Sequence, residues 1–563
     1  MSILTTNKVN CKDCYKCVRH CPLNAIRVAD GHAQVDPDRC ILDGNCYKVC
    51  PQNAKSIRND IEIAKNVIKQ SNNVIASVAP SFFAYYSESK RGKILTALKY
   101  LGFNHIEQTS RAAYTVAKAH FDLYKNTDKA VITSSCPAIV NLVEKYYPEL
   151  IPNLAPIVSP MVAHYKILEQ EHYKDFDMVF IGPCVAKKQE IEGTNIAACI
   201  TFSELDEWIE QEELDIDNLE PIFFDVFYSR TSSLFPLLGG LIKAAGLDDS
   251  NLDNELLSVN GVENVQEVLD ALKTNRLKAR FIETLACHGG CIMGPARPKS
   301  EQETNYYELK TNIISTFSET KKYKLDQDIL AEKATARYYT DRSLKIAEPA
   351  EEEIRIVLAS IGKTRPEDEH NCGACGYDSC KEKAKAVILG MAEKEMCIPF
   401  MKSQAEKFSS IVLDATPNGV VVLDNDLNII EANPAFLRLI ELNKVDLIGK
   451  HISLFIDEQP FQDVQKNNDE IFESRTIYKD KEIKRIVFYV HDKKLITGIF
   501  VDITDIEAHK AALINVRKET LERAQKVINK QMRVAQEIAG LLGETTAETK
   551  VLLGQLVKIL QQE

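Results

Sequence analysis

Four cysteines in the middle of the chain have the types and surroundings needed for redox chemistry. They lie in three separate segments, each with glycine, proline or charged residues beside the thiol. Four thiolates are the ligand set of one cubane iron–sulfur cluster. The sequence therefore predicts that the three segments converge around such a cluster. The four residues are Cys136, Cys184, Cys287 and Cys291.

The residues around these cysteines resemble the three signature segments of [FeFe]-hydrogenases, whose usual forms are TSCCP, MPCxxKKxE and ExMACxGGC. In this chain the segments are Thr133–Pro137, Gly182–Glu190 and Glu283–Cys291, and the resemblance covers roughly residues 75–340. It implies an H-cluster, in which a [4Fe–4S] cubane is bridged through one cysteine sulfur to a diiron unit with CO, cyanide and dithiolate ligands. By the same resemblance, Cys291 is the bridging cysteine.

The resemblance also implies roles for residues beside the cysteines. Lys187 matches the lysine that holds a cyanide ligand, and an ammonium in a dry pocket suits an anionic ligand. Glu190 matches the glutamate of the same family segment. Gly289 and Gly290 leave room for the backbone to pass close to inorganic sulfide, and Pro183 is expected against the cofactor. The alternative for Lys187 and Glu190 is that they are surface charges.

Several positions depart from the family pattern. Ser135 replaces the first cysteine of TSCCP, whose thiol shuttles protons to the diiron unit in hydrogenases. A thiol with a pKa near ~8.5 exchanges protons at neutral pH, whereas an alkyl hydroxyl is a much poorer acid. Gly182 and Leu285 replace the two methionines, and the segment 110–126 has no glutamate where fast enzymes carry acidic relay residues. Because the cluster ligands survive while the proton route is weakened, we expect the slow, sensory branch of the family.

The N-terminal segment Cys11–Pro22 has the cysteine spacing of bacterial two-cluster ferredoxins. A second run, Cys40–Pro51, keeps the spacing but has Asp43 where a ferredoxin has its second cysteine. The motif implies that the last cysteine of each run crosses over to the other cluster. The expected ligand sets are Cys11, Cys14, Cys17 and Cys50 for one cluster, and Cys21, Cys40 and Cys46 with Asp43 or an exogenous ligand for the other.

Three interpretations of Asp43 stay open. Its carboxylate ligates the fourth iron as a hard oxygen donor, or that iron is absent and a [3Fe–4S] cluster forms. In the third interpretation Asp43 only starts the turn with Gly44. Zinc is a weaker alternative for the whole segment, because the spacing is that of ferredoxins.

A third cysteine group follows the charged segment 347–353. It resembles the small four-cysteine [4Fe–4S] domain also found in corrinoid iron–sulfur proteins, and a helix is expected between its last two cysteines. Zinc held by the same four thiolates is the competing interpretation. Together with the two clusters of the ferredoxin-like module, this group gives about three expected clusters in addition to the H-cluster. Its cysteines are Cys372, Cys375, Cys380 and Cys397.

The C-terminal part resembles a PAS domain followed by helices. The PAS resemblance rests on Ile411–Asp424 and on Ile429–Phe436, which contains the Asn-Pro pair of the family's opening pattern. The ligand of this PAS domain is unknown. Beyond it, apolar residues recur in steps of three and four, as in a coiled coil. We expect the tail to form a homodimer, and the alternative is packing back onto the PAS domain.

Buried strand patterns precede three of the cysteine motifs, at 130–133, 178–181 and 280–286, and another lies at 74–80. Helical patterns between them, such as 92–101 and 263–273, predict an α/β domain whose strand ends carry the ligands. The fold class is therefore multidomain α/β. The predicted domains are a two-cluster ferredoxin-like module at 1–58, an H-cluster domain at 71–345, a four-cysteine iron–sulfur domain at 353–402, a PAS domain (α+β) at 405–508 and a helical output segment at 509–563.

Composition limits the function classes. The 69 basic and 81 acidic residues give a net charge of −12, which argues against a nucleic-acid partner. There is no apolar run of about 18 residues and no apolar signal core, so we expect a cytoplasmic protein with no membrane segment. A reducing compartment disfavours disulfides among the 16 cysteines. Cys199, the one outside the three groups, is expected to be an inert buried thiol.

These features predict a sensory [FeFe]-hydrogenase of low turnover, which reacts with H2 and protons and passes its redox state to the PAS domain. The expected partners are a soluble electron carrier such as ferredoxin, a separate kinase or phosphatase for output, and maturation proteins for the diiron unit. Two alternatives stay open. One is a catalytic, ferredoxin-linked hydrogenase, and the other is a diiron-free iron–sulfur protein that acts in cluster assembly or electron transfer.

Overall fold

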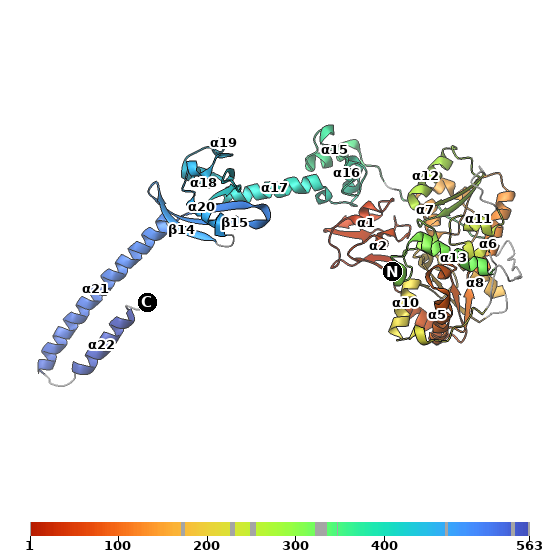
Figure 1. The fold of residues 1–563 in the computed structure, drawn as a ribbon, viewed down its shortest axis with the longest axis horizontal. Coiled ribbons are helices and arrows are strands. Elements are labelled where there is room, and N and C mark those ends of the chain that lie inside the picture. Colours follow the sequence, from red (N-terminus) through yellow and green to blue (C-terminus); the bar gives the residue numbers. More distant parts are fainter. Residues whose placement is uncertain are drawn as a thin grey trace. The chain divides into compact units, whose positions relative to one another are not determined.

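The computed structural model describes residues 2–170, 175–225, 231–247, 255–320, 335–345, 347–467, 471–541 and 546–560. The chain forms two compact units, Met1–Met401 and Lys402–Glu563 (Figure 1). The first unit contains all sixteen cysteines. The positions relevant to redox chemistry therefore belong to one unit, and the PAS sheet belongs to the other.

The N-terminal module is built from two short antiparallel pairs. Strand β1 (Leu4–Thr6) pairs with β4 (Lys55–Ile57), and β2 (Ile26–Ala29) pairs with β3 (His32–Val35). The β2–β3 turn has Asp30 and Gly31 at positive φ, as a tight hairpin turn requires. Each cysteine run opens into one short helix, α1 (Lys16–Arg19) and α2 (Asn45–Lys48). Strand β4 completes this sheet, and α3 (Ile61–Gln70) follows it.

The domain that follows contains two parallel sheets. One has the strand order β6-β5-β8-β9, and the other has the order β10-β11-β7. Strands β5, β8, β9 and β11 are almost entirely buried, as parallel strands covered by helices on their faces must be. Their bounds are β5 (Val74–Val78), β6 (His105–Gln108), β7 (Val131–Ile132), β8 (Asp177–Gly182), β9 (Ala198–Thr201), β10 (Leu256–Asn260) and β11 (Phe281–Leu285).

Helices connect these strands and cover the sheets (Figure 1). The predicted helices at 92–101 and 263–273 are confirmed, and both begin slightly earlier than predicted. Strands β6, β9 and β10 were not predicted. The helices are α4 (Phe82–Tyr85), α5 (Glu88–Tyr100), α6 (Ser110–Lys125), α7 (Pro137–Tyr146), α8 (Pro160–Gln170), α9 (Lys187–Glu190), α10 (Phe202–Gln211), α11 (Gly240–Ala244), α12 (Val262–Lys273) and α13 (Tyr306–Thr320).

The third cysteine group lies on a small helical domain. Helix α15 (Glu351–Ser360) packs against α16 (Cys380–Ile388) through Ile354, Leu358 and Ala384. The Ser379 hydroxyl accepts the Glu382 backbone N–H and so caps α16. Two of the four cysteines lie in the loop before α16, one opens α16 and one follows it. Helix α16 is therefore the element that closes the ligand set.

The second unit contains a five-stranded antiparallel sheet with the order β13-β12-β16-β15-β14. Asn433 caps α18 (Pro434–Ile440) and binds strand β12 as well, because its Oδ1 accepts the N–H groups of Val420 and Phe436. This explains the Asn-Pro pair of the PAS pattern. The strands are β12 (Gly419–Leu423), β13 (Ile429–Ala432), β14 (Phe472–Tyr478), β15 (Lys481–Val490) and β16 (Leu495–Asp502), and the other helices are α17 (Ile398–Ala415), α19 (Lys444–Leu447) and α20 (Gln459–Asn467).

The tail consists of two helices, α21 (Thr504–Leu541) and α22 (Thr546–Leu560). Large apolar side chains along both are exposed, among them Leu513, Val527, Leu552 and Ile559. Homodimerisation through this tail stays a prediction. Among the described residues, no helix combines the length and apolar character needed to cross a bilayer.

Candidate functional site

Three loops bring the four central cysteines together. Cys136 follows β7, Cys184 follows β8, and Cys287 and Cys291 follow β11, so all four lie at carboxyl ends of parallel strands. Burial raises the pKa of the Cys287 thiol well above its ordinary value, and the thiols of Cys184, Cys291 and Cys136 raise it further. These four thiols therefore share one neighbourhood, as the ligands of a single cubane must.

A cavity of about 80 Å³ opens beside these thiols. Its wall is largely apolar, with Phe180, Phe235 and Leu285 among its side chains, and among the described residues of its lining Lys187 is the only cation. The Ser135 hydroxyl also lines the cavity, is buried, and has no hydrogen-bond partner among the described residues. A buried hydroxyl without a partner is costly unless a bound group supplies one. The cavity therefore suits a cofactor whose ligands accept hydrogen bonds.

Lys187 is the first residue of α9, and its side chain is nearly buried. Its Nζ donates to Glu190 Oε2 at 2.5 Å, one helical turn further along. The same ammonium lowers the pKa of the Cys136, Cys184 and Cys291 thiols, although burial keeps each raised overall. One cation thus faces three of the four thiols. The interpretation of Lys187 and Glu190 as surface charges is wrong, because both side chains are buried.

Glu190 has two further partners that the sequence did not indicate. Ser159 Oγ donates to Oε2 at 2.9 Å, and Arg337 Nη1 donates to Oε1 at 2.7 Å. These interactions and the Lys187 ammonium lower the pKa of Glu190 against the effect of burial. The Glu190 carboxylate stays ionised between two cations. Arg337 belongs to no cysteine motif, so no local pattern could have identified it.

The glycines after Cys287 form a close-fitting turn. Gly289 and Gly290 both have positive φ, and a Cβ atom on Gly290 would lie 2.5 Å from the Pro236 carbonyl oxygen. Gly182, where the family has a methionine, has no room for a side chain, because Phe180 fills that space and lines the cavity instead. Leu285 occupies the other methionine position in the cavity wall. Pro183 lines the same cavity next to Cys184.

A histidine that the sequence did not indicate, His120, lies near the serine pair Ser134 and Ser135. The segment 110–126 contains no glutamate, but its His120 lies beside Ser134, with Nε2 at 3.2 Å from the serine oxygen. Burial lowers the pKa of His120 to about 4, so this imidazole is neutral. Ser134 donates instead to the Ile157 carbonyl oxygen. Neither group has a hydrogen bond to Ser135, whose hydroxyl is isolated from them.

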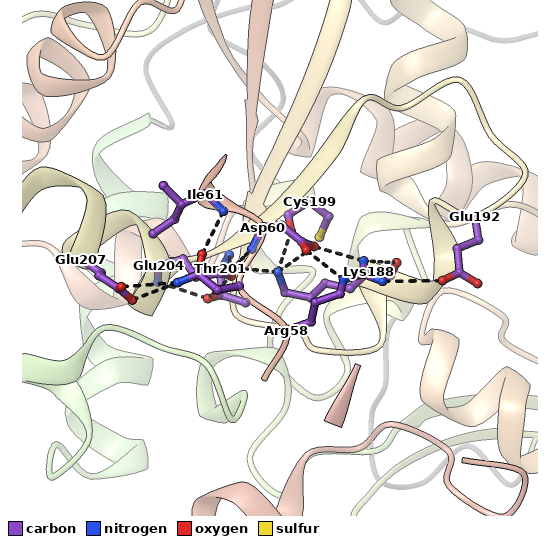
Figure 2. A network of polar contacts seen from close by, with 10 residues as sticks. Arg58, Asp60, Ile61, Lys188, Glu192, Cys199, Thr201, Glu204 and Glu207 are labelled. Carbon is purple, nitrogen blue, oxygen red and sulfur yellow. Dashed lines mark hydrogen bonds and ion pairs between the residues drawn. The ribbon is translucent and has the colours of Figure 1, made fainter. Parts of the chain in front are cut away.

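An ion network centred on the buried Lys188 side chain holds α9 in place (Figure 2). Lys188 Nζ donates to Asp60 Oδ2, to Glu204 Oε1 and to the Cys199 carbonyl oxygen, at 2.9 to 3.0 Å. Arg58 makes a bidentate pair with Asp60. All three ammonium protons of Lys188 are therefore used, and α9 is tied to both α10 and the start of α3.

The substitution Lys188→Met is expected to lower the free energy of unfolding by about 3–5 kcal/mol, because it leaves Glu204 buried without its cation. Guanidinium denaturation of the full-length protein measures the loss. Lys385→Met is the matched control, since Lys385 pairs with Glu348 at 2.7 Å but is 36% exposed. A change of no more than about 1 kcal/mol is expected there. Equal losses in both variants would show that the network does not stabilise the fold.

The cysteines of the N-terminal module separate into two neighbourhoods. Burial raises the pKa of Cys17, and so do the thiols of Cys11, Cys50 and Cys14. Burial likewise raises the pKa of Cys21 to about 12, with Asp43 and Cys40 adding to it. Burial raises the pKa of Cys46 well above its ordinary value, and the same Asp43, Cys40 and Cys21 raise it further. The two groups have the same members as the two expected crossed ligand sets, and ligation itself stays a prediction.

Asp43 lies in the second neighbourhood, that of Cys21, Cys40 and Cys46. Burial raises the pKa of its carboxyl to about 6, while the backbone N–H groups of Asn45 and Gly44 lower it. Asp43 also raises the pKa of Cys287, and both residues line one small cavity. A Cβ atom on Gly44 would lie 2.5 Å from Pro295 Cγ. The second neighbourhood is therefore in direct contact with the central cysteine site, and the three interpretations of Asp43 stay open.

The third cysteine group also surrounds a single cavity. Cys372, Cys375, Cys380 and Cys397 line it together with Lys383. Lys383 is buried, donates to the Glu393 carbonyl oxygen, and lowers the pKa of Cys375 against the effect of burial. A buried cation beside four thiols balances the negative charge that a thiolate-ligated cluster carries.

Four family models match the chain. The C-terminal domain of the iron-only hydrogenase large subunit matches residues 72–295, and a 4Fe-4S dicluster domain matches residues 10–54. An Fe-S cluster model matches residues 369–399, and a PAS model matches residues 417–505. The chain is thus a multidomain α/β protein with an iron-hydrogenase-type domain, a ferredoxin-like module, a further iron–sulfur domain and a PAS domain. The hydrogenase family implies an H-cluster and [4Fe–4S] clusters.

Relatives of two kinds match the chain. Iron hydrogenase 1 of Clostridium pasteurianum is 26% identical over 55% of this chain and 68% of its own length. The cytosolic Fe-S cluster assembly factor narfl of Xenopus tropicalis is 22% identical over 46% of this chain and 67% of its own length. A solved [FeFe]-hydrogenase variant from Chlamydomonas reinhardtii is 16% identical, with a TM-score of 0.40, and the match covers 51% of this chain and 100% of that one. Across three hydrogenase relatives, the chain spans 58% to 68% of the relative's length.

Proposed function

We propose that this chain is a sensory hydrogenase that reacts slowly with dihydrogen and relays its redox state to the PAS domain and a partner protein. The observation that carries the proposal is the cavity beside the four thiols. Lys187 and the unpartnered Ser135 hydroxyl line it, and the rest of its wall is largely apolar. A protein that held only a cubane would have no need of such a cavity.

The residues present fit an H-cluster. Cys136, Cys184 and Cys287 would hold the cubane, and Cys291, which lines the cavity, would hold both the cubane and the diiron unit. Lys187 would donate to a cyanide ligand with the ammonium protons that Glu190 leaves free. When bound, an H-cluster supplies the heterolytic splitting of dihydrogen and takes up the electrons. The chain's own part is to hold the group, keep it dry and deliver protons.

Proton delivery is the part that the chain performs poorly. Ser135 stands where fast enzymes have a thiol, and its hydroxyl has no hydrogen bond that leads away from the cavity. His120 is neutral and bonded to Ser134. Slow exchange of protons limits turnover but does not prevent a redox response to dihydrogen. This combination supports a sensor over a bulk producer of hydrogen.

The route for electrons is supported by contacts between the three cysteine sites. Cys287 of the central site lies next to Asp43, which lies among Cys21, Cys40 and Cys46. The four-cysteine domain packs on the same module. Electrons would pass from the H-cluster through the ferredoxin-like clusters to the four-cysteine cluster, whose state would bias the PAS domain and a homodimeric tail. Output through a separate kinase or phosphatase and maturation by dedicated proteins belong to the proposal.

The assembly-factor relatives define the competing function, in which no diiron unit is bound. The cavity beside Lys187 argues against it, because a cubane held alone does not need an apolar cavity next to two of its ligands. The other competitor is a fast, ferredoxin-linked hydrogenase. High turnover by the unmodified protein would favour that function over the sensory one.

The substitution Ser135→Cys tests the proposal directly. A thiol at this position restores an acid that exchanges protons at neutral pH, so hydrogen oxidation by the matured protein is expected to rise about 10-fold or more. Dye-coupled hydrogen uptake measures the rate, and the unmodified protein should give a low but finite value.

Ser134→Cys is the control for this substitution. Its side chain points to Ile157 and not into the cavity, so turnover should stay at the level of the unmodified protein. An equal rate in Ser135→Cys and the unmodified protein, with the cofactor present in both, would contradict the explanation by proton delivery.

A further inference from the structure

The four-cysteine domain is docked on the ferredoxin-like module through backbone contacts. The Val28 N–H donates to the Met391 carbonyl oxygen at 2.9 Å, and Arg19 Nη1 donates to the Ala374 carbonyl oxygen at 3.3 Å. The Gly31 N–H donates to the Glu393 carboxylate at 3.2 Å. Contacts of this kind fix both position and register. The two cluster-bearing parts therefore have a defined relation within the first unit.

The contact is closest at the loop that carries Cys375. Gly376 has a φ of +93°, and a Cβ atom on it would lie 2.8 Å from Val18 Cγ1 and 3.1 Å from the Arg19 backbone nitrogen. Val18 and Arg19 belong to α1 of the ferredoxin-like module. Only glycine allows the two backbones to approach this closely without strain. The next residue, Tyr377, is thereby placed in the space between the two parts.

Tyr377 lies between thiols of two different cluster sites. Its side chain is 4% exposed, and it lines the cavity formed by the four cysteines of the small domain. Burial raises the pKa of its hydroxyl to about 12, with the Cys375 and Cys21 thiols adding to it and the Arg39 cation lowering it. That hydroxyl has no hydrogen-bond partner among the described residues. A buried tyrosine usually finds one, so the hydroxyl lacks an acceptor that the protein itself does not supply.

We propose that the Tyr377 hydroxyl donates a hydrogen bond to a sulfur atom of the cluster held by Cys372, Cys375, Cys380 and Cys397, and thereby makes this cluster easier to reduce. Hydrogen bonds to cluster sulfur stabilise the more negative, reduced state and raise the potential. The buried Lys383 ammonium beside the same thiols acts in the same direction. The four-cysteine cluster then accepts electrons more readily than it would without this hydroxyl.

This inference rests on the proposed function for its biological meaning, since it makes the four-cysteine cluster the resting place of electrons from dihydrogen. Its physical content is independent of the diiron unit. A chemical titration of the clusters therefore tests it without hydrogen, and its failure would leave the proposed function standing.

The test is the variant Tyr377→Phe, which keeps the ring and removes the hydroxyl. Redox titration of the full-length protein, followed by electron paramagnetic resonance, should show the four-cysteine cluster harder to reduce. At a fixed potential its ratio of reduced to oxidised form is expected to fall about tenfold, which for a one-electron couple is a shift of ~59 mV. The potentials of the ferredoxin-like clusters should stay unchanged.

Tyr146→Phe is the matched control. Burial raises the pKa of Tyr146, and Cys21 raises it further, but its hydroxyl already donates to the Arg39 carbonyl oxygen at 2.7 Å. This variant should leave the four-cysteine cluster at its original potential. The inference is overturned if Tyr377→Phe shifts no cluster, or shifts only a ferredoxin-like one.

A second measurement needs no variant and covers the case in which Tyr377→Phe fails to bind its cluster. Pulsed electron paramagnetic resonance of the reduced four-cysteine cluster in the unmodified protein should show a strongly coupled proton that disappears in D2O. The absence of an exchangeable proton near this cluster would overturn the inference on its own.

Discussion

Replacing Cys291 with alanine is expected to remove the infrared bands of iron-bound CO and cyanide from the matured protein. Cys291 neighbours the other central thiols and, like Cys184, lines the cavity beside Lys187. The resemblance to [FeFe]-hydrogenases makes its sulfur the bridge to the diiron unit. Without that sulfur no covalent link holds the diiron unit, and the loss should be complete. Infrared spectroscopy of protein matured in parallel with the unmodified chain measures it.

Cys199→Ala is the matched control for this prediction. Cys199 is also a buried thiol in the same domain, but it lies on β9 and belongs to no cysteine motif. Its contact with Lys188 is made by the backbone carbonyl, which alanine retains. The bands should persist in Cys199→Ala. Full-intensity bands in Cys291→Ala would contradict the assignment of the bridging cysteine.

The substitution Lys187→Met is expected to reduce the bound diiron unit about 10- to 100-fold, the usual cost of losing a group that holds a metal ligand. Methionine is similar in length, so the loss follows from the missing ammonium and not from an added cavity. Glu190 keeps Arg337 and Ser159 as partners, so its charge stays compensated. The measurement is the intensity of the CO and cyanide bands relative to total iron.

Lys273→Met provides the comparison for this variant. Lys273 pairs with Glu149 but is 52% exposed and lies on α12, away from the cavity. Its removal should leave the bands unchanged. If Lys187→Met retained the diiron unit as well as Lys273→Met does, Lys187 would be a structural residue of α9 only.

The elements that carry the central cysteines could be predicted because each motif follows a run of buried residues. The strands at 130–133, 178–181 and 280–286 are confirmed within one or two residues. Strand β6, with the sequence His-Ile-Glu-Gln, has no apolar pattern of its own. Its place is decided by pairing with β5, a long-range contact that a local sequence pattern does not contain.

The candidate site was predicted well where residues lie in register with a cysteine, and poorly elsewhere. Lys187 and Glu190 share a motif with Cys184, and both are buried. Lys187 lines the cavity, and Glu190 accepts a hydrogen bond from Lys187. Arg337 lies about 150 residues further along and reaches Glu190 only through the fold. Tyr377 belongs to a cysteine motif, yet its approach to Cys21 depends on the docking of two domains. Such contacts have no signal in a single sequence.

The infrared spectrum of the unmodified protein after maturation decides whether the cavity holds a diiron unit. The cavity beside Cys291 and Lys187 is proposed to hold one, and iron-bound CO and cyanide absorb where protein does not. We expect these bands, and we expect them to shift when dihydrogen is admitted. A protein with its full complement of iron–sulfur clusters and no such bands would contradict this proposal, and would place the chain with the diiron-free proteins.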